Sequence, residues 1–278
     1  MLERTDKGNK MNKSNFRFKK EFGQNFIFDK NFIKSMVGKF DIPEQSNIVE
    51  IGAGMGTLTE VLAGKYKKVV SFEIDKTLTE KLEELQSKHS NLTIIFGDIL
   101  QQNLENIEGM FGGEDYYIVA NLPYYITSQI IFKFLFESSN LKAMFTMVQK
   151  EVGERYCASC GSREYGIPSV ILNTFANTDI VCNVSRKMFV PVPNVDSCII
   201  KIELQKNKFN IADQDKFRSF VAGCFAMKRK TLANNLKKMN FHDDIISPAL
   251  QQLSMRSDIR PEDISVENYI NLFNLLYR

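Results

Sequence analysis

The sequence predicts an α/β protein in which a doubly wound parallel sheet is followed by a small all-helical domain. Short runs rich in β-branched residues alternate with helix-length segments as far as Leu204, which is the pattern of a parallel sheet covered by helices. Beyond Leu204, apolar residues recur at helical spacing instead. A chain of 278 residues is long enough for one large domain and a small second one.

The expected strands are the short apolar runs of the first 204 residues. Parallel neighbours need crossover segments between them, and helical patterns at 75–88 and 127–137 provide two of these. The last two runs have no long helix between them, so we expect an antiparallel hairpin at one edge of the sheet. The runs lie at 47–51, 68–74, 92–96, 116–120, 143–148, 180–184 and 197–204.

Charge and polarity divide the chain into three expected parts. Residues 1–20 carry seven Lys and Arg against two Asp and Glu, and are expected to form a flexible basic arm. Residues 21–204 form the acidic sheet domain, and residues 205–278 form a basic helical domain whose last helix is capped by Ser265. Basic ends around an acidic centre favour binding of a polyanion, although a solvated surface with a basic arm explains the charge equally well.

Composition excludes several classes of protein. Apolar residues make up 44% of the chain and charged residues 25%, which excludes disordered and fibrous proteins. No run approaches the roughly 18 apolar residues of a membrane span, and the N-terminus has no apolar stretch typical of a secretory signal. Five irregularly spaced cysteines favour a reducing compartment, so we expect a cytoplasmic protein. Cys157 and Cys160 have zinc-like spacing, but no second pair completes four ligands, and we expect no metal site.

A glycine-rich turn follows the first strand. In Glu-Ile-Gly-Ala-Gly-Met-Gly, the residues Gly52, Gly54 and Gly56 let the backbone approach a cofactor where a Cβ would clash. Glu73 ends the second strand and can accept both hydroxyls of a ribose. Asp98 follows the third strand and can accept the amino group of an adenine. NAD would fit the first two features, whereas Asp98 argues against it.

Asn121, Leu122, Pro123 and Tyr124 follow the fourth strand. Methylation of an exocyclic amino nitrogen is difficult, because its lone pair is conjugated into the ring. The side-chain oxygen of Asn121 and the carbonyl of Leu122 can accept the two amino hydrogens, while Pro123 fixes the turn. Tyr124 offers an aromatic face on which an extruded base can stack. The four residues therefore predict methyl transfer to a nucleobase.

Five motifs in a fixed order make the chain resemble the ribosomal RNA adenine dimethyltransferases, and its small-subunit members most of all. The motifs are Phe-Gly-Gln-Asn-Phe-Ile at 22–27, the glycine turn at 50–56, Asn-Leu-Pro-Tyr-Tyr-Ile-Thr at 121–127, Gln-Lys-Glu-Val at 149–152 and Phe-Val-Pro-Val-Pro-Asn-Val-Asp-Ser at 189–197. The resemblance implies a Rossmann-like domain that uses S-adenosylmethionine as cofactor. It also implies dimethylation of N6 on two adjacent adenines near the 3′ end of small-subunit (16S) rRNA, with a role in subunit biogenesis.

The resemblance implies roles around the cofactor. Asn25 and Ile27 would contact it, and Gln24 would close over it beside them. The glycine turn would pass its methionine part, Glu73 would hold its ribose and Asp98 its adenine amino group.

It also implies roles around the substrate. Asn121 would touch both the methyl donor and the target amine, and Phe189 would cover the flipped base opposite Tyr124. Packing in the core is the alternative for Phe189. Gln129 departs from the family, which often has proline there, and leaves the start of the following helix less certain.

The expected partner is the small ribosomal subunit with its rRNA, bound by a monomer. Two basic clusters can contact phosphates, and such contacts position RNA without selecting its sequence. They are Arg17, Lys19 and Lys20 before the first motif, and Lys228, Arg229 and Lys230 at the expected start of a helix.

Three other functions remain open at this point. A large-subunit rRNA methyltransferase of the erythromycin-resistance type would use the same chemistry on another target. An assembly factor could bind the small subunit with methylation dispensable. A DNA adenine methyltransferase usually has a larger recognition domain than the C-terminal part of this chain.

Overall fold

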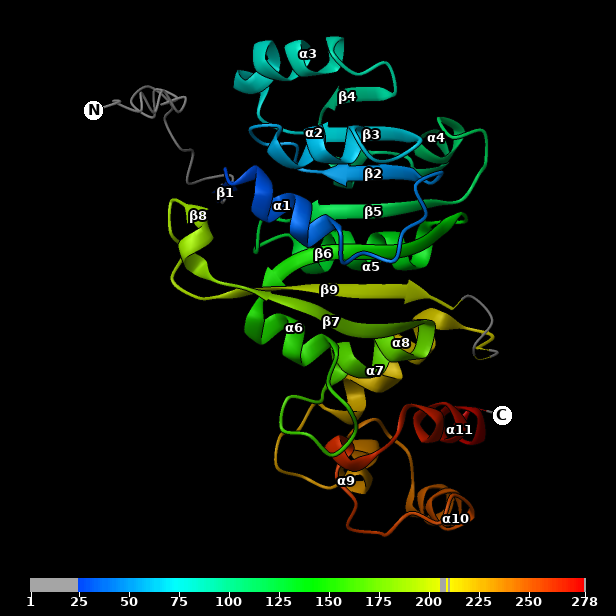
Figure 1. Cartoon of the computed structure of the whole chain (residues 1–278). Coiled ribbons are helices and arrows are strands. Elements are labelled where there is room, and N and C mark those ends of the chain that lie inside the picture. The colour runs from blue at the N-terminus through cyan, green and yellow to red at the C-terminus, as the bar shows by residue number, and fades with distance from the viewer. Residues whose placement is uncertain (1–24, 206–208, 210, 278) are drawn as a thin grey trace, which may run out of the picture.

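A seven-stranded sheet forms the centre of the computed structural model, which describes residues 25–205, 209 and 211–277 (Figure 1). The strand order is β4-β3-β2-β5-β6-β9-β7. Strands β2 to β6 are parallel, β9 is antiparallel to β6, and β7 is antiparallel to β9. The strands are β2 (Asn47–Ile51), β3 (Lys68–Glu73), β4 (Leu92–Phe96), β5 (Tyr116–Asn121), β6 (Leu141–Gln149), β7 (Ala176–Val184) and β9 (Ser197–Leu204). The seven predicted strands are thus confirmed, and so is the antiparallel pair at one edge.

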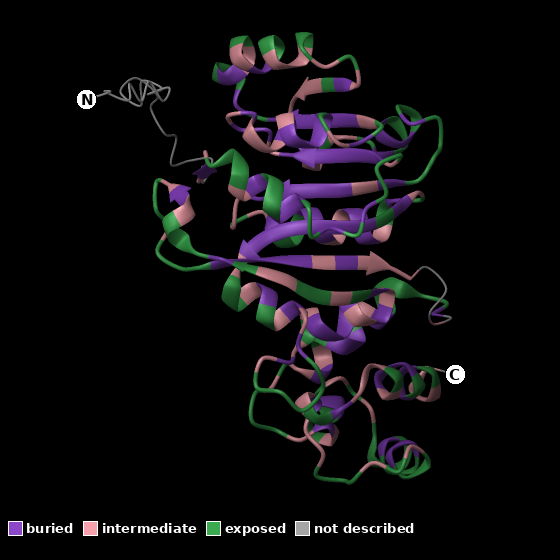
Figure 2. Ribbon diagram, viewed as in Figure 1, coloured by how far each residue is buried: buried purple, intermediate pink, exposed green. Residues whose placement is uncertain are grey.

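Helices cover both faces of this sheet. Residues of α1 and α2 pack on one face, and residues of α4, α5 and α7 pack on the other. All five residues of β2 are buried, as expected for a strand covered on both sides, and the central strands are coloured as buried in Figure 2. The helices are α1 (Lys30–Val37), α2 (Thr57–Ala63), α3 (Thr79–Ser87), α4 (Leu104–Gly109), α5 (Thr127–Glu137), α6 (Lys150–Tyr156) and α7 (Ile167–Phe175), with 3-10 turns η2 (Lys76–Leu78), η3 (Ile99–Gln101) and η4 (Arg186–Met188).

Both predicted crossover helices are present. The one expected at 127–137 is α5, so Gln129 does not disturb its start. The one expected at 75–88 is divided into η2 and α3. Its first turn is tight because the side chain of Asp75 accepts a hydrogen bond from the backbone of Thr77.

A second, two-stranded sheet joins distant parts of the chain. Strand β1 (Phe26–Ile27) pairs antiparallel with β8 (Phe189–Val190), so that Phe26 lies opposite Val190 and Ile27 opposite Phe189. In Figure 1 this pair lies at the left, at the end of the large sheet where β2, β3 and β5 terminate. The pairing brings two of the sequence motifs to the same edge of the molecule.

The C-terminal part is helical, as the sequence predicts. It contains α8 (Gln214–Cys224), α9 (Leu232–Lys238), α10 (Asp243–Gln252), the 3-10 turn η5 (Pro261–Asp263) and α11 (Val266–Leu276). Ser265 caps α11 by accepting a hydrogen bond from the backbone of Asn268. Phe217 and Phe273 share a core with Val170 and Ile171 of α7. The domain boundary near residue 205 stays a prediction, because this core crosses it.

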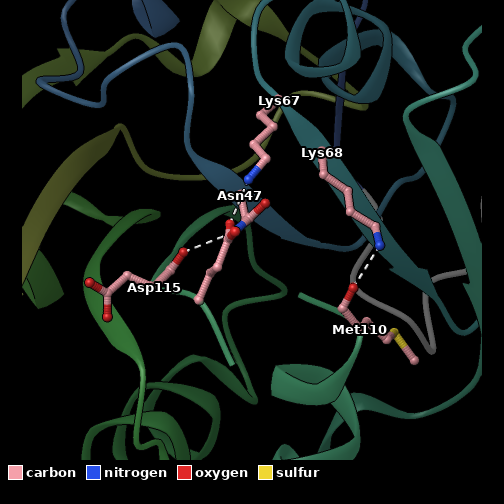
Figure 3. A network of polar contacts seen from close by, with 6 residues as sticks. Asn47, Lys67, Lys68, Met110 and Asp115 are labelled. Atoms are coloured by element: carbon pink, nitrogen blue, oxygen red, sulfur yellow. Dashed lines mark hydrogen bonds and ion pairs between the residues drawn. The ribbon is translucent and has the colours of Figure 1, made fainter. Parts of the chain in front are cut away.

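A polar network lies at the other end of the strands, where β2, β3 and β5 begin (Figure 3). The amide nitrogen of Asn47 donates to Oε2 of Glu114 and to the carbonyl of Asp115, both at 3.1 Å. Lys67 Nζ lies 2.6 Å from the same Glu114 oxygen, and Lys68 Nζ donates to a carbonyl just after α4 at 2.6 Å. These groups satisfy one another, so the network holds this end of the sheet together.

Candidate cofactor and substrate site

A pocket opens at the edge of the sheet where β2 to β5 end. Ligands of open α/β sheets bind at this edge, because the loops after parallel strands converge there. Ten of the predicted site residues line the pocket: Asn25, Ile27, Gly52, Gly54, Glu73, Asp98, Asn121, Leu122, Pro123 and Tyr124. The motifs at 22–27, 50–56 and 121–127 thus share one cavity with Glu73 and Asp98.

The glycine turn forms the floor between β2 and α2. Gly52 has φ +84° and Gly54 has φ +54°, which are left-handed conformations that favour glycine. A Cβ on Gly54 would lie 2.7 Å from the ring of Phe26, so the turn and β1 are in close contact. Gly56 does not line the pocket; it precedes α2, and a Cβ there would lie 2.9 Å from Leu85.

Glu73 presents a buried carboxylate to the pocket. Oε2 accepts a hydrogen bond from the backbone of Gly54 at 2.7 Å, and Oε1 accepts one from the backbone of Asp75 at 2.8 Å. Burial raises the pKa of this carboxyl, and the backbone hydrogen bonds oppose the increase. On the next strand, Asp98 caps η3 by accepting from the backbone of Leu100 at 2.9 Å. Both carboxylates are therefore fixed by main-chain donors.

The Asn-Leu-Pro-Tyr turn is held by two distant partners. Nδ2 of Asn121 donates to the carbonyl of Asn25 at 3.1 Å. This bond identifies the other end of the amide, Oδ1, as its acceptor for a ligand. The hydroxyl of Tyr124 lies 2.8 Å from Oγ of Ser197 at the start of β9. The turn thus has a fixed amide and a fixed aromatic ring on the same wall.

Glu50, at the second-last position of β2, is a group to which the sequence assigned no role. It is fully buried, and its Oε2 accepts a hydrogen bond from Ser71 of β3 at 2.6 Å. Oε1 and the buried hydroxyl of Thr59 have no hydrogen-bond partner among the described residues. Burial raises the pKa of Glu50 to about 7, against the opposing effects of the Ser71 hydroxyl and of the neighbouring Thr59 hydroxyl. The acid preceding the glycines was visible in the sequence, but its burial was not.

Phe189 does not lie on the pocket wall. Its side chain is 1% exposed and packs in the core of the α1 and α2 face. The reason is the pairing of β1 with β8, which sets Phe189 opposite the equally buried Ile27. This structure thus has the core packing that was the alternative for Phe189, and its expected position over a base opposite Tyr124 stays a prediction.

Lys228, Arg229 and Lys230 lie in the turn between α8 and α9, and not at a helix start as predicted. Helix α9 begins at Leu232, because Thr231 caps it. All three basic side chains are exposed, and none forms an ion pair within the described part of the chain. The other predicted basic residues, Arg17, Lys19 and Lys20, lie outside the described residues, as does Gln24.

The predicted cysteine pair lies away from the pocket. Cys157 is half-buried, which raises the pKa of its thiol to about 11, and Cys160 is exposed. In the residues that the structure describes, no three His, Cys, Asp or Glu side chains gather as they would around a metal ion.

Comparison with known proteins gives a consistent result. Residues 15–278 match the family model described as ribosomal RNA adenine dimethylase. The chain is 41% identical over 261 residues to ribosomal RNA small subunit methyltransferase A of Caldanaerobacter subterraneus subsp. tengcongensis, covering 93% of this chain and 97% of that protein. It is 40% identical over 271 residues to the protein of the same name from Bacillus mycoides, covering 95% and 93%.

Solved structures have the same fold. A dimethyladenosine transferase from Plasmodium falciparum is 26% identical with a TM-score of 0.76, over 89% of this chain and 95% of that one. The 23S rRNA methyltransferase ErmE is 23% identical with a TM-score of 0.72, over 91% and 100%. The described helices include none with the length and apolar character needed to cross a bilayer.

Proposed function

Because the chain belongs to the ribosomal RNA adenine dimethylase family, we propose that it transfers methyl groups from S-adenosylmethionine to N6 of two adjacent adenines near the 3′ end of small-subunit (16S) rRNA. The observation that carries the proposal is the Asn-Leu-Pro-Tyr turn on the wall of the same pocket as Glu73 and Asp98. The names of the relatives at about 40% identity support the small subunit as the target.

The residues of the pocket fit S-adenosylmethionine. Glycines at positive φ form the turn, and a Cβ at Gly54 would press on the ring of Phe26 in β1. Glu73 is a carboxylate fixed at the end of β3, where it can accept the ribose hydroxyls. Asp98 follows β4 and can accept the adenine amino group. Asn25, just before β1, and Ile27, in β1, would cover the cofactor. When bound, S-adenosylmethionine supplies a methyl group on a sulfonium sulfur, a good leaving group.

Asn121 and Leu122 act on the target amine. The acceptor Oδ1 of Asn121 and the carbonyl of Leu122 would hold the two hydrogens of N6, which favours a pyramidal nitrogen whose lone pair is no longer conjugated with the ring. The same dipoles stabilise positive charge as it develops on the nitrogen. Tyr124 offers its ring to the extruded adenine, and Ser197 keeps that ring in place. Pro123 fixes the turn that sets these groups side by side.

The partner is the small ribosomal subunit, and contact with its RNA is assigned to the basic turn at 228–230, whose three side chains are exposed. Phosphate contacts there would position the protein, while the shape of the target loop would supply specificity. We expect the protein to act as a monomer in the cytoplasm.

The test uses radiolabelled S-adenosylmethionine with four substrates: small subunits that lack adenine dimethylation, naked 16S rRNA, naked large-subunit rRNA and duplex DNA. We expect N6,N6-dimethyladenosine on the small-subunit particle. Asn121→Ala should lose methyl transfer while its fold and its affinity for S-adenosylmethionine persist. Product on large-subunit rRNA would mean that the target is the large subunit. An unaffected rate in Asn121→Ala would refute the role of this residue.

A further inference from the structure

Tyr125 on the pocket wall, and two valines of a loop that is joined to this wall through Ser197, are left in solvent. Tyr125 is 61% exposed, although it lines the pocket directly after Tyr124. In the loop between β8 and β9, Val192 is 59% exposed and Val195 is 45% exposed. Figure 2 shows exposed residues on both sides of β8, at the end of the sheet where the pocket opens.

The loop between β8 and β9 is braced by its own hydrogen bonds and is joined to the pocket wall where β9 begins. The backbone of Arg186 donates to Oδ1 of Asp196 at 2.9 Å, and its guanidinium Nη1 donates to the carbonyl of Asn194 at 2.9 Å. Ser197, the next residue along, bonds the hydroxyl of Tyr124. The exposed valines are therefore held on a braced loop that is joined to the substrate wall.

Two cations accompany these side chains. Arg186 and Lys187 are exposed in η4, and neither has an ion-pair partner within the described residues. Cations elsewhere on the sheet domain often do have one: Lys30 lies 2.7 Å from Glu60, and Lys133 lies 3.1 Å from Glu137. The carboxylate of Asp196 lies beside Arg186, but it accepts from the backbone and forms no ion pair within the described residues. Exposed cations outside ion pairs, beside exposed apolar side chains, match the phosphates and bases of a single strand.

We propose that this rim, defined as Tyr125, Arg186, Lys187, Val192 and Val195, holds the single-stranded RNA that flanks the extruded adenine. The inference rests on the proposed function, and it assigns the RNA contacts next to the pocket. The base beside the target stacks on Tyr125, the strand passes over the two valines, and Lys187 and the remaining donors of Arg186 take its phosphates. Tyr125 is the position for the neighbouring base because its ring follows that of Tyr124 in the chain and stays outside the core.

Steady-state methylation of undimethylated small subunits tests the rim in the full-length protein. Tyr125→Leu should raise KM for subunits by about 5- to 150-fold, the loss expected for one base–aromatic stack, while Tyr125→Phe keeps the ring and stays near wild type. Lys187→Gln should lower the salt dependence of subunit binding by about 0.7 in the log–log slope. Lys142→Gln is the matched control, because Lys142 pairs with Asp115 at the opposite edge of the sheet.

The outcomes separate the two proposals. The proposed rim is refuted if Tyr125→Leu leaves the KM for subunits unchanged, or raises the KM for S-adenosylmethionine instead. Dimethylation by the wild-type protein would still support the proposed function in that case. A salt slope for Lys187→Gln equal to that of Lys142→Gln overturns the phosphate contact. Wild-type protein that makes no dimethyladenosine on any substrate overturns the proposed function itself. Thermal unfolding of each variant confirms that a change in KM is not a loss of fold.

Discussion

Replacing Glu50 by glutamine should remove a pH-dependent loss of stability between about pH 4.5 and pH 7. Glu50 is fully buried, with one oxygen bonded to Ser71 and the other without a partner among the described residues. The glutamine keeps an acceptor for Ser71, and its amide can donate to the hydroxyl of Thr59. It therefore mimics the protonated carboxyl at every pH.

The magnitude follows from the shift in pKa. The ordinary pKa of 4.5 is raised to about 7 in the folded protein. The folded state thus keeps a proton that the unfolded state has already released, so raising the pH through this window favours unfolding. Each unit of pKa corresponds to about 1.4 kcal/mol, and the whole shift is worth about 3 kcal/mol.

Urea unfolding in the absence of cofactor measures the effect. The free energy of unfolding is determined for wild type and Glu50→Gln at intervals from pH 4.5 to pH 8, and one curve is subtracted from the other. Wild type should fall by about 3 kcal/mol relative to the variant as the pH rises. Ser71→Ala should move the fall to higher pH, because the Ser71 hydroxyl opposes the rise in pKa.

A constant difference between the two curves would refute the reasoning. It would mean that Glu50 has the same proton affinity in the folded and unfolded states, which is incompatible with a dry environment around the carboxyl. A difference that grows as the pH falls would be equally damaging, since it would require the folded state to stabilise the charged form.

Three further predictions concern binding. Gly54→Ala should weaken S-adenosylmethionine binding in calorimetry, because a Cβ at φ +54° would lie 2.7 Å from Phe26; undiminished affinity would contradict the cradle. Glu73→Ala should abolish that binding and lower the free energy of unfolding by about 1–3 kcal/mol, since the backbone donors of Gly54 and Asp75 lose their acceptor; urea titration measures the second effect. Replacing 228–230 by glutamines should reduce the salt slope of subunit binding by about 2 without changing cofactor affinity, and an unchanged slope would remove this turn from the RNA interface.

The parts of the fold that were predictable are those specified by local pattern. Runs of β-branched residues predicted the strands, and helical spacing predicted α5 at residues 127–137, where it lies. The pocket followed from topology, since parallel strands place Glu73, Asp98 and Asn121 at one edge once the strands themselves are known. The side chains at the carboxyl ends of the strands could therefore be assigned to one site from the sequence alone.

The parts that escaped prediction depend on contacts between distant residues. Strands β1 and β8 have two residues each, too few for a periodic pattern, and lie about 160 positions apart in the sequence. That pairing buries Phe189, which sequence alone could place either in the core or over a base. The sequence pattern predicted a helix start at residues 228–230, whereas Thr231 caps α9 and these residues lie in the turn before it.

Two long-range hydrogen bonds hold the Asn-Leu-Pro-Tyr turn, one next to the small sheet and one at the start of β9. Asn121 bonds the carbonyl of Asn25, which directly precedes β1, and Tyr124 bonds Ser197, which follows the loop after β8. Ser197 pairs with Gln149 of β6 and Val184 of β7, so the large sheet positions the partner of the tyrosine hydroxyl. The backbone next to β1 positions the partner of the amide. Asn25 also lines the cofactor pocket. In the proposed function, covering of the cofactor and orientation of the amide that receives the adenine would therefore both depend on Asn25.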